Sequence, residues 1–249
     1  MRVDLTDYND AASRIVAWGK QRESRYVCVA SVNNVMEART SDAFLKIMNG
    51  ADLVTPDGVP LVWSLRLLGL PQATRVYGPD LTPVLCERAA AAQVPVGFYG
   101  GTPDVLDSLV ANLQRLHPSL NVVYRFAPPF TALTEEETRR VNEEIVASGA
   151  RIIFVGLGTP KQEIWMADRR GTIPAVMVGV GAAFDFLAGR KKQAPPAMQA
   201  LGLEWLFRLC TEPRRLWKRY LYRNPRFVFL IARQLIAKRL LPSAGRVAS

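Results

Sequence analysis

Residues 151–163, RIIFVGLGTPKQE, form an apolar run followed by a glycine-containing turn and the start of a helix. Runs of this kind recur along the chain and alternate with amphipathic segments, which is the pattern of a parallel sheet flanked by helices. We therefore predict an α/β fold. The strands are expected at Tyr26–Ser31, Val94–Tyr99, Asn121–Arg125, Arg151–Val155 and Ala175–Val178.

The helices between these strands have recognisable starts. Leu and Val residues between 106 and 116 recur at helical spacing and form one apolar stripe. Thr102 is the expected N-cap of this helix, and Pro103 takes its first position. Two further starts fit the capping box, in which a hydroxyl and a Glu or Gln three residues later satisfy each other's free N–H groups. These are Thr134–Glu137 and Thr159–Gln162.

Composition and charge indicate a globular protein with a basic end. Hydrophobic residues make up 49% and charged residues 22% of the 249 residues, so disorder is not expected. The net charge is +10, yet the first 189 residues hold 18 Lys/Arg against 20 Asp/Glu. From Arg190 onward there are 14 Lys/Arg and two Glu. This end of the chain is therefore expected to meet an anionic partner, which is phosphate, lipid head groups or nucleic acid.

The C-terminal segment differs in composition from the body of the chain. From Leu201 onward, aromatic and aliphatic residues interleave with Arg and Lys, and Pro213 and Pro225 interrupt the helical pattern. We predict a body over residues 1–195 and a basic amphipathic helical appendage over residues 196–249. The appendage is expected to lie in an anionic membrane interface, and the alternative is a solvated basic helix packed on the body.

The expected location is the cytoplasm. No window holds 18 uncharged apolar residues, and the first residues lack the basic and apolar regions of a signal peptide. Cys28, Cys86 and Cys210 lie far apart in apolar surroundings, as expected for three reduced core thiols of a cytosolic protein. We therefore expect a protein that does not span a membrane.

Asp57 is the first candidate for a catalytic group. It lies in a turn directly after a short apolar run, and ligands of open α/β sheets bind at the carboxyl ends of strands. A carboxylate at that place is a candidate general base. Pro-Asp-Gly is also common turn chemistry, in which the Asp side chain bonds its own backbone.

Two glycine loops are candidates for phosphate contacts. One holds Gly156 and Gly158, and the other holds Gly179 and Gly181. Glycines let a phosphate approach the backbone, and the start of the next helix offers free N–H groups. Neither loop has the dinucleotide or Walker pattern, so tight packing of a helix on a strand stays open as the alternative.

Two other polar features of the sequence bear on function, a Ser-Val-Asn segment and a single histidine. Ser31 and Asn33 follow the first predicted strand, where they either bind a sugar hydroxyl or cap the next helix. His117 is the single histidine and ends a helix, which excludes a Ser/His/Asp triad and a His-based metal site.

A set of short motifs occurs in a fixed order along the chain. They are Val29–Asn33, Asp52 with Pro56-Asp57-Gly58, the Arg75–Leu81 segment, Gly100-Gly101, GLGTPKQEIW at 156–165, GVGAAFDFLAG at 179–189, and Ala194-Pro195 before GLEWLFRLCTEPRR. By these motifs the chain resembles the bacterial glycosyltransferases of the WecG/TagA/CpsF family, from about Tyr26 to about Arg219. Two departures are that Gln193 stands where the family has Arg, and that Ala127–Phe130 replaces a G-Y-F motif.

The resemblance implies a Rossmann-like domain and an inverting transfer from a UDP-sugar to a sugar on a polyprenyl diphosphate, at the cytoplasmic membrane face. It implies Asp57 as the base, with the hydroxyl of Ser31 as a second catalytic residue, and arginines of the appendage at the diphosphate. The expected substrate-binding residues are Asn33, Arg75, Asp80, Gly156, Gly158, Lys161, Gln162, Glu163, Gly179, Gly181, Asp185, Arg214, Arg215 and Arg219.

No cofactor and no bound metal are expected, because the sequence has no D-x-D pattern. Arginines and the glycine-loop helix ends are then expected to stabilise the departing UDP. Two alternative functions compete with the transferase. A nucleotide-dependent oxidoreductase would need a full glycine fingerprint, and a nucleic-acid-binding protein would use a basic tail less rich in Trp, Phe and Leu.

Overall fold

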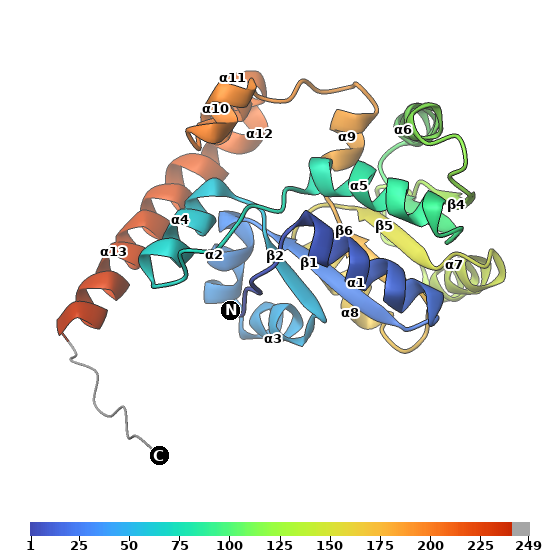
Figure 1. The fold of residues 1–249 in the computed structure, drawn as a ribbon, viewed down its shortest axis with the longest axis horizontal. Helices are drawn as coiled ribbons and strands as arrows, with labels where there is room; N and C mark the ends of the chain where they lie inside the picture. Colours follow the sequence, from blue (N-terminus) through green and yellow to red (C-terminus); the bar gives the residue numbers. More distant parts are fainter. Residues whose placement is uncertain (241–249) are drawn as a thin grey trace, which may run out of the picture.

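The computed structural model describes residues 1–240 and contains one sheet of six parallel strands in the order β2-β1-β6-β5-β3-β4 (Figure 1). The predicted α/β class with a Rossmann-like parallel sheet is confirmed. All five expected strands are present, and the apolar run before Asp57 forms the sixth. The strands are β1 (Arg25–Ala30), β2 (Leu53–Pro56), β3 (Val96–Gly100), β4 (Val122–Phe126), β5 (Ile152–Gly156) and β6 (Val176–Gly179).

Helices cover both faces of the sheet because each crossover buries one apolar stripe (Figure 1). The first face packs against α1 (Tyr8–Lys20), α5 (Gly78–Ala91), α6 (Pro103–Leu116) and α9 (Ala183–Leu187). The second face packs against α2 (Val32–Thr40), α3 (Asp42–Gly50), α7 (Glu135–Ala147) and α8 (Lys161–Asp168). The short helix α4 (Val59–Leu67) follows β2. Its buried Leu61 belongs to the second core.

The predicted helix starts were right in two cases and wrong in one. Pro103 opens α6 and Thr102 is its N-cap, although the hydroxyl makes no capping hydrogen bond. Thr134 and Glu137 form the expected capping box of α7. The box expected at Thr159 does not form, because α8 begins one residue later with Pro160 at its N-cap and the Thr159 hydroxyl bonds a buried carboxylate instead.

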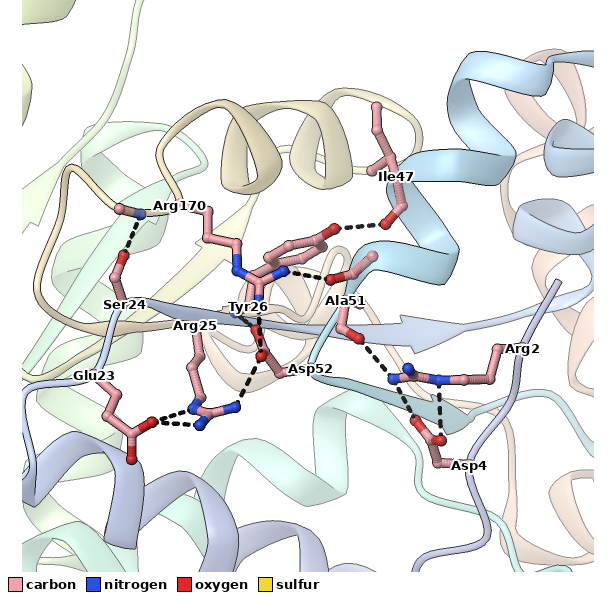
Figure 2. Close-up of polar contacts among 12 residues, drawn as sticks. Arg2, Asp4, Glu23, Ser24, Arg25, Tyr26, Ile47, Ala51, Asp52 and Arg170 are labelled. Carbon is pink, nitrogen blue, oxygen red and sulfur yellow. Dashed lines mark hydrogen bonds and ion pairs between the residues drawn. The ribbon is translucent and has the colours of Figure 1, made fainter.

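A buried carboxylate ties together the amino ends of β1 and β2, at the edge of the sheet away from the ligand-binding end (Figure 2). Asp52 is only 5% exposed and accepts hydrogen bonds from Arg25 at 2.9 Å, Arg170 at 2.8 Å and the backbone N–H of Tyr26 at 3.0 Å. The Asp52 that the family resemblance singled out therefore has a structural explanation within the sheet.

The C-terminal segment is helical, as predicted. It consists of α10 (Pro196–Ala200), α11 (Glu204–Thr211), α12 (Pro213–Lys218), the π-helix η1 (Arg219–Arg223) and α13 (Asn224–Leu240). It packs against α2 and contributes Phe227, which is 3% exposed, to the second core. The last nine residues of the predicted appendage lie outside the described residues.

Two of the three cysteines are buried, namely Cys28 and Cys86. Cys210 is exposed, so the expectation of three core thiols was wrong for this residue. It lies on α11, a helix with no buried residue. Within residues 1–240, no helix is both long enough and apolar enough to cross a membrane.

Candidate active site

A pocket lies at the carboxyl ends of β1, β2, β5 and β6. After β1 the chain enters α2 on one face of the sheet, whereas after β6 it enters α9 on the other face (Figure 1). Divergence of this kind opens a crevice at the edge of an α/β sheet. The loops after these strands line the pocket together with residues of α11 and η1, so the C-terminal segment forms part of its wall.

Asp57 lies on this wall, one residue beyond β2. Its backbone N–H donates to the carbonyl of Ala30 at 2.8 Å, which continues the pairing of β2 with β1. Its side chain is 22% exposed. Burial raises the pKa of Asp57 to about 7, Arg75 opposes this rise, and Glu204 adds to it. A carboxyl group that titrates near neutrality is suited to accept a proton.

Arg75 joins Asp57 to the C-terminal segment. Its Nε donates to the main-chain oxygen of Asp57 at 2.6 Å, and its Nη2 forms an ion pair with Glu204 of α11. The guanidinium lies over the ring of Tyr77 at 4.0 Å, and the Tyr77 hydroxyl donates to Glu204 at 2.8 Å. Arg75 and Tyr77 therefore hold α11 against the loop that carries Asp57.

A second polar cluster joins the start of α2 to the start of α8. The Oε1 atom of the fully buried Glu163 accepts hydrogen bonds from Asn34 at 2.9 Å, Thr159 at 3.0 Å and Gln162 at 3.0 Å, and these three residues line the pocket. The Ser31 hydroxyl donates to the other end of the Asn34 amide at 3.0 Å. Burial raises the pKa of Glu163. The three hydrogen bonds to its Oε1 atom fix the positions of the pocket residues that donate them.

The glycine loops combine both interpretations that the sequence left open. Gly158 and Gly181 have φ values of +76° and +55° and lie on the pocket wall. Gly156 serves packing, because a Cβ atom there would lie 2.6 Å from the ring of Phe184. Gly179 does both, since it lines the pocket and a Cβ atom there would lie 2.7 Å from a side chain of α8. Each loop therefore has at least one glycine on the pocket wall.

The comparison with known families decides the identity of the chain. A model of the glycosyl transferase WecG/TagA/CpsF family matches residues 1–240. The chain belongs to this family. A glycosyltransferase takes a donor sugar and an acceptor, so the family supports a transferase rather than an oxidoreductase or a nucleic-acid-binding protein. Among residues 1–240, no cluster of three His, Cys, Asp or Glu side chains is arranged to hold a metal ion.

The structure brings about half of the predicted substrate-binding residues of this glycosyltransferase to the pocket. Those on the wall are Asn33, Arg75, Gly158, Gln162, Gly179, Gly181 and Arg215. Those away from the wall are Asp80, Gly156, Lys161, Glu163, Asp185 and Arg214. The side chain of Arg219 lies outside the described part of the structure.

The residues away from the wall have other partners or face solvent. Asp80 accepts a hydrogen bond from the Tyr8 hydroxyl at 3.2 Å. Asp185 forms an ion pair with Lys191 at 2.8 Å, which braces the turn after α9. Lys161 and Arg214 are exposed on their helices. Their placement follows from local helix geometry, which sequence motifs alone did not reveal.

The wall residues of this glycosyltransferase that were not predicted from the sequence include Tyr77, Glu204, Trp205, Arg208 and Arg223. Glu204, Trp205 and Arg208 belong to the GLEWLFRL motif and lie on α11. That motif was the available signal, since it mixes charged and aromatic residues within one turn of a helix. Arg208 has no ion-pair partner among the ion pairs found within residues 1–240, although its guanidinium lies 5.6 Å from the Phe186 ring.

Proposed function

We propose that the protein transfers a sugar, with inversion, from a UDP-sugar to a sugar on a polyprenyl diphosphate in cell-surface polysaccharide synthesis. The observation that carries the proposal is Asp57, a pocket carboxyl with a pKa of about 7. In a single displacement, the acceptor hydroxyl oxygen bonds to the anomeric carbon as the bond from that carbon to the UDP oxygen breaks. The hydroxyl proton passes to Asp57.

The departing UDP carries negative charge that must be stabilised. Arg208 and Arg215 line the same pocket as Asp57, and the loops that hold Gly158 and Gly181 border it. Preorganised cations of this kind stabilise charge that develops in a transition state. We assign the diphosphate to this side of the pocket, with no bound metal or other cofactor required. Ser31 also lines the pocket, and we assign it to the acceptor side, where its hydroxyl bonds Asn34.

A lipid-linked acceptor requires the protein to work at a membrane surface. The C-terminal segment combines its basic residues with exposed apolar ones, including Leu221 at 58% and Phe229 at 66% exposed. Such a surface suits an interface in which apolar groups enter the acyl region and cations meet phosphates. We assign the protein to the inner face of the cytoplasmic membrane, bound peripherally.

The proposal is tested by incubating the purified protein with single UDP-sugars and a lipid-linked acceptor extracted from membranes. Mass spectrometry should detect one added sugar on the lipid, and NMR of the product should show the anomeric configuration opposite to that of the donor. Retention of the donor configuration would reject the single displacement. Transfer to soluble sugars alone would reject the lipid-linked acceptor.

A further inference from the structure

One arm of the Arg75 guanidinium, its Nη2 amino group, lies between two carboxylates. Its Nη2 forms an ion pair with Oε2 of Glu204 and lies 3.8 Å from Oδ1 of Asp57. The rest of the guanidinium is anchored, because Nε bonds the main-chain oxygen of Asp57 at 2.6 Å and Cζ lies 4.0 Å from the centre of the Tyr77 ring. The guanidinium is therefore held within reach of Asp57, and the direction of this one arm depends on Glu204.

Both carboxylate oxygens of Glu204 have a partner. Its Oε1 accepts the Tyr77 hydroxyl at 2.8 Å, while its Oε2 binds Arg75, and its side chain is 15% exposed. A carboxylate with both oxygens engaged is not placed to receive the proton of an acceptor hydroxyl. Glu204 also sits in the first turn of α11, so it reaches Arg75 only when the C-terminal segment is docked.

We infer that Glu204 is a positioning residue that draws the guanidinium of Arg75 away from the carboxylate of Asp57, so that Asp57 becomes an effective base only while α11 is docked. The inference rests on the proposed role of Asp57. It ties the reactivity of the site to the segment that we assign to the membrane surface. Without Glu204, the free arm of Arg75 would close on Asp57 and hold it as an ion-paired, weakly basic carboxylate.

The charges around Asp57 support the same direction. Arg75, from the loop before α5, and Arg208, from α11, favour its ionised form. Glu204, from α11, and Asp80, from α5, disfavour it, while burial is the largest influence. Removing the charge of Glu204 takes away one of the two opposing carboxylates and releases the nearer cation. Both consequences lower the pKa of Asp57.

The test is a titration of the full-length protein by ¹³C NMR of its side-chain carboxyl carbons. The signal of Asp57 is assigned by its absence from an Asp57→Asn sample. In Glu204→Gln, the midpoint of Asp57 should fall by about one pH unit or more. The acidic limb of the pH profile of transfer should move by the same amount, and turnover at pH 8 should fall about tenfold because the base is weaker.

The matched control is Glu212→Gln. Glu212 belongs to the same segment and pairs with Lys191 and Arg215, but not with Arg75. Its substitution removes one carboxylate from the same segment but keeps the Glu204–Arg75 ion pair, so the midpoint of Asp57 should stay at its wild-type value. A second substitution, Arg75→Gln, added to Glu204→Gln should raise the midpoint again, because the cation that lowers it is gone.

The outcomes separate the inference from the proposed function. A folded Glu204→Gln protein with an unchanged Asp57 midpoint would overturn the inference, whether or not the protein transfers sugar. An equal fall of the midpoint in Glu212→Gln would overturn it too, since the loss of any carboxylate from this segment would then explain the effect. Transfer that survives Asp57→Asn would reject the proposed base and leave the titration result standing.

Discussion

The guanidinium of Arg223 donates a hydrogen bond to the side-chain oxygen of Asn33 at 2.7 Å, across 190 residues of sequence. The same guanidinium forms an ion pair with Glu37 at 2.8 Å. Through these two contacts η1 is fastened to α2, and Asn33 and Arg223 both line the pocket. Helix α2 and the C-terminal segment therefore share one wall of the site.

Arg223→Ala should weaken transfer by loosening this wall. We expect kcat/KM for the lipid-linked acceptor to fall about tenfold, which corresponds to losing one hydrogen bond to a charged group. UDP affinity should change little, because the glycine loops remain. Arg226→Ala, an exposed arginine on the next helix, is the control. Equal effects of the two substitutions would point to general loss of positive charge.

Asp57→Asn should abolish most turnover while leaving the fold intact. Asn keeps the size and much of the hydrogen bonding of Asp but cannot take a proton, so turnover should fall roughly 10²–10⁴-fold. Calorimetry should give nearly the wild-type affinity for UDP. Asp107→Asn, at a largely exposed carboxylate paired with Arg125, is the matched control and should keep full turnover. If turnover of Asp57→Asn fell less than tenfold, Asp57 would have only a structural role in the turn.

The pH dependence of both activity and stability follows from the pKa of about 7 at Asp57. The base must be ionised, so kcat/KM should rise through pH 7 and level off above it. Stability changes in the opposite sense. The folded protein keeps a proton on Asp57 that the unfolded chain has lost, so the free energy of unfolding should fall as pH rises from about 4 to 7. Denaturant titrations of Asp57→Asn, compared with wild type, should lack this component.

UDP should bind without added metal. The prediction rests on the absence of a D-x-D pattern and on the arginines and glycine loops around the pocket. Titration calorimetry in a chelating buffer should give an affinity within about twofold of that in Mg²⁺ or Mn²⁺, a difference below 1 kcal/mol. Binding that requires either ion would contradict the prediction.

Removing residues 210–249 should abolish sedimentation with anionic liposomes. The deletion takes away ten Lys/Arg, and each basic residue near an anionic surface contributes about 1 kcal/mol. The sheet should stay folded, because its cores come mainly from earlier elements, although loss of Phe227 exposes apolar surface and lowers the melting temperature. Neutral liposomes are the control. Equal sedimentation of the two proteins with anionic liposomes would assign the membrane contact elsewhere.

The order of strands and helices was readable in the sequence because it depends on local patterns. Apolar runs marked five strands, and Pro103 and the Thr134–Glu137 box marked two helix starts. Asp57 was identified as the base candidate since it follows an apolar run and ligands bind at the carboxyl ends of such strands. These features involve residues that are neighbours in the chain, so their spacing carries the information.

The surroundings of this candidate base were decided by the tertiary structure. Glu204 meets Arg75 across 129 residues and Glu163 meets Asn34 across the same separation, and no pattern within a segment specifies such partners. Spacing also did not distinguish Gly158, which borders the pocket, from Gly156, which packs against Phe184. The sequence alone determined the kinds of elements and the chemical groups at their ends. Only the packing of distant segments determined burial and charge around Asp57, because both depend on which side chains fill the space beside it.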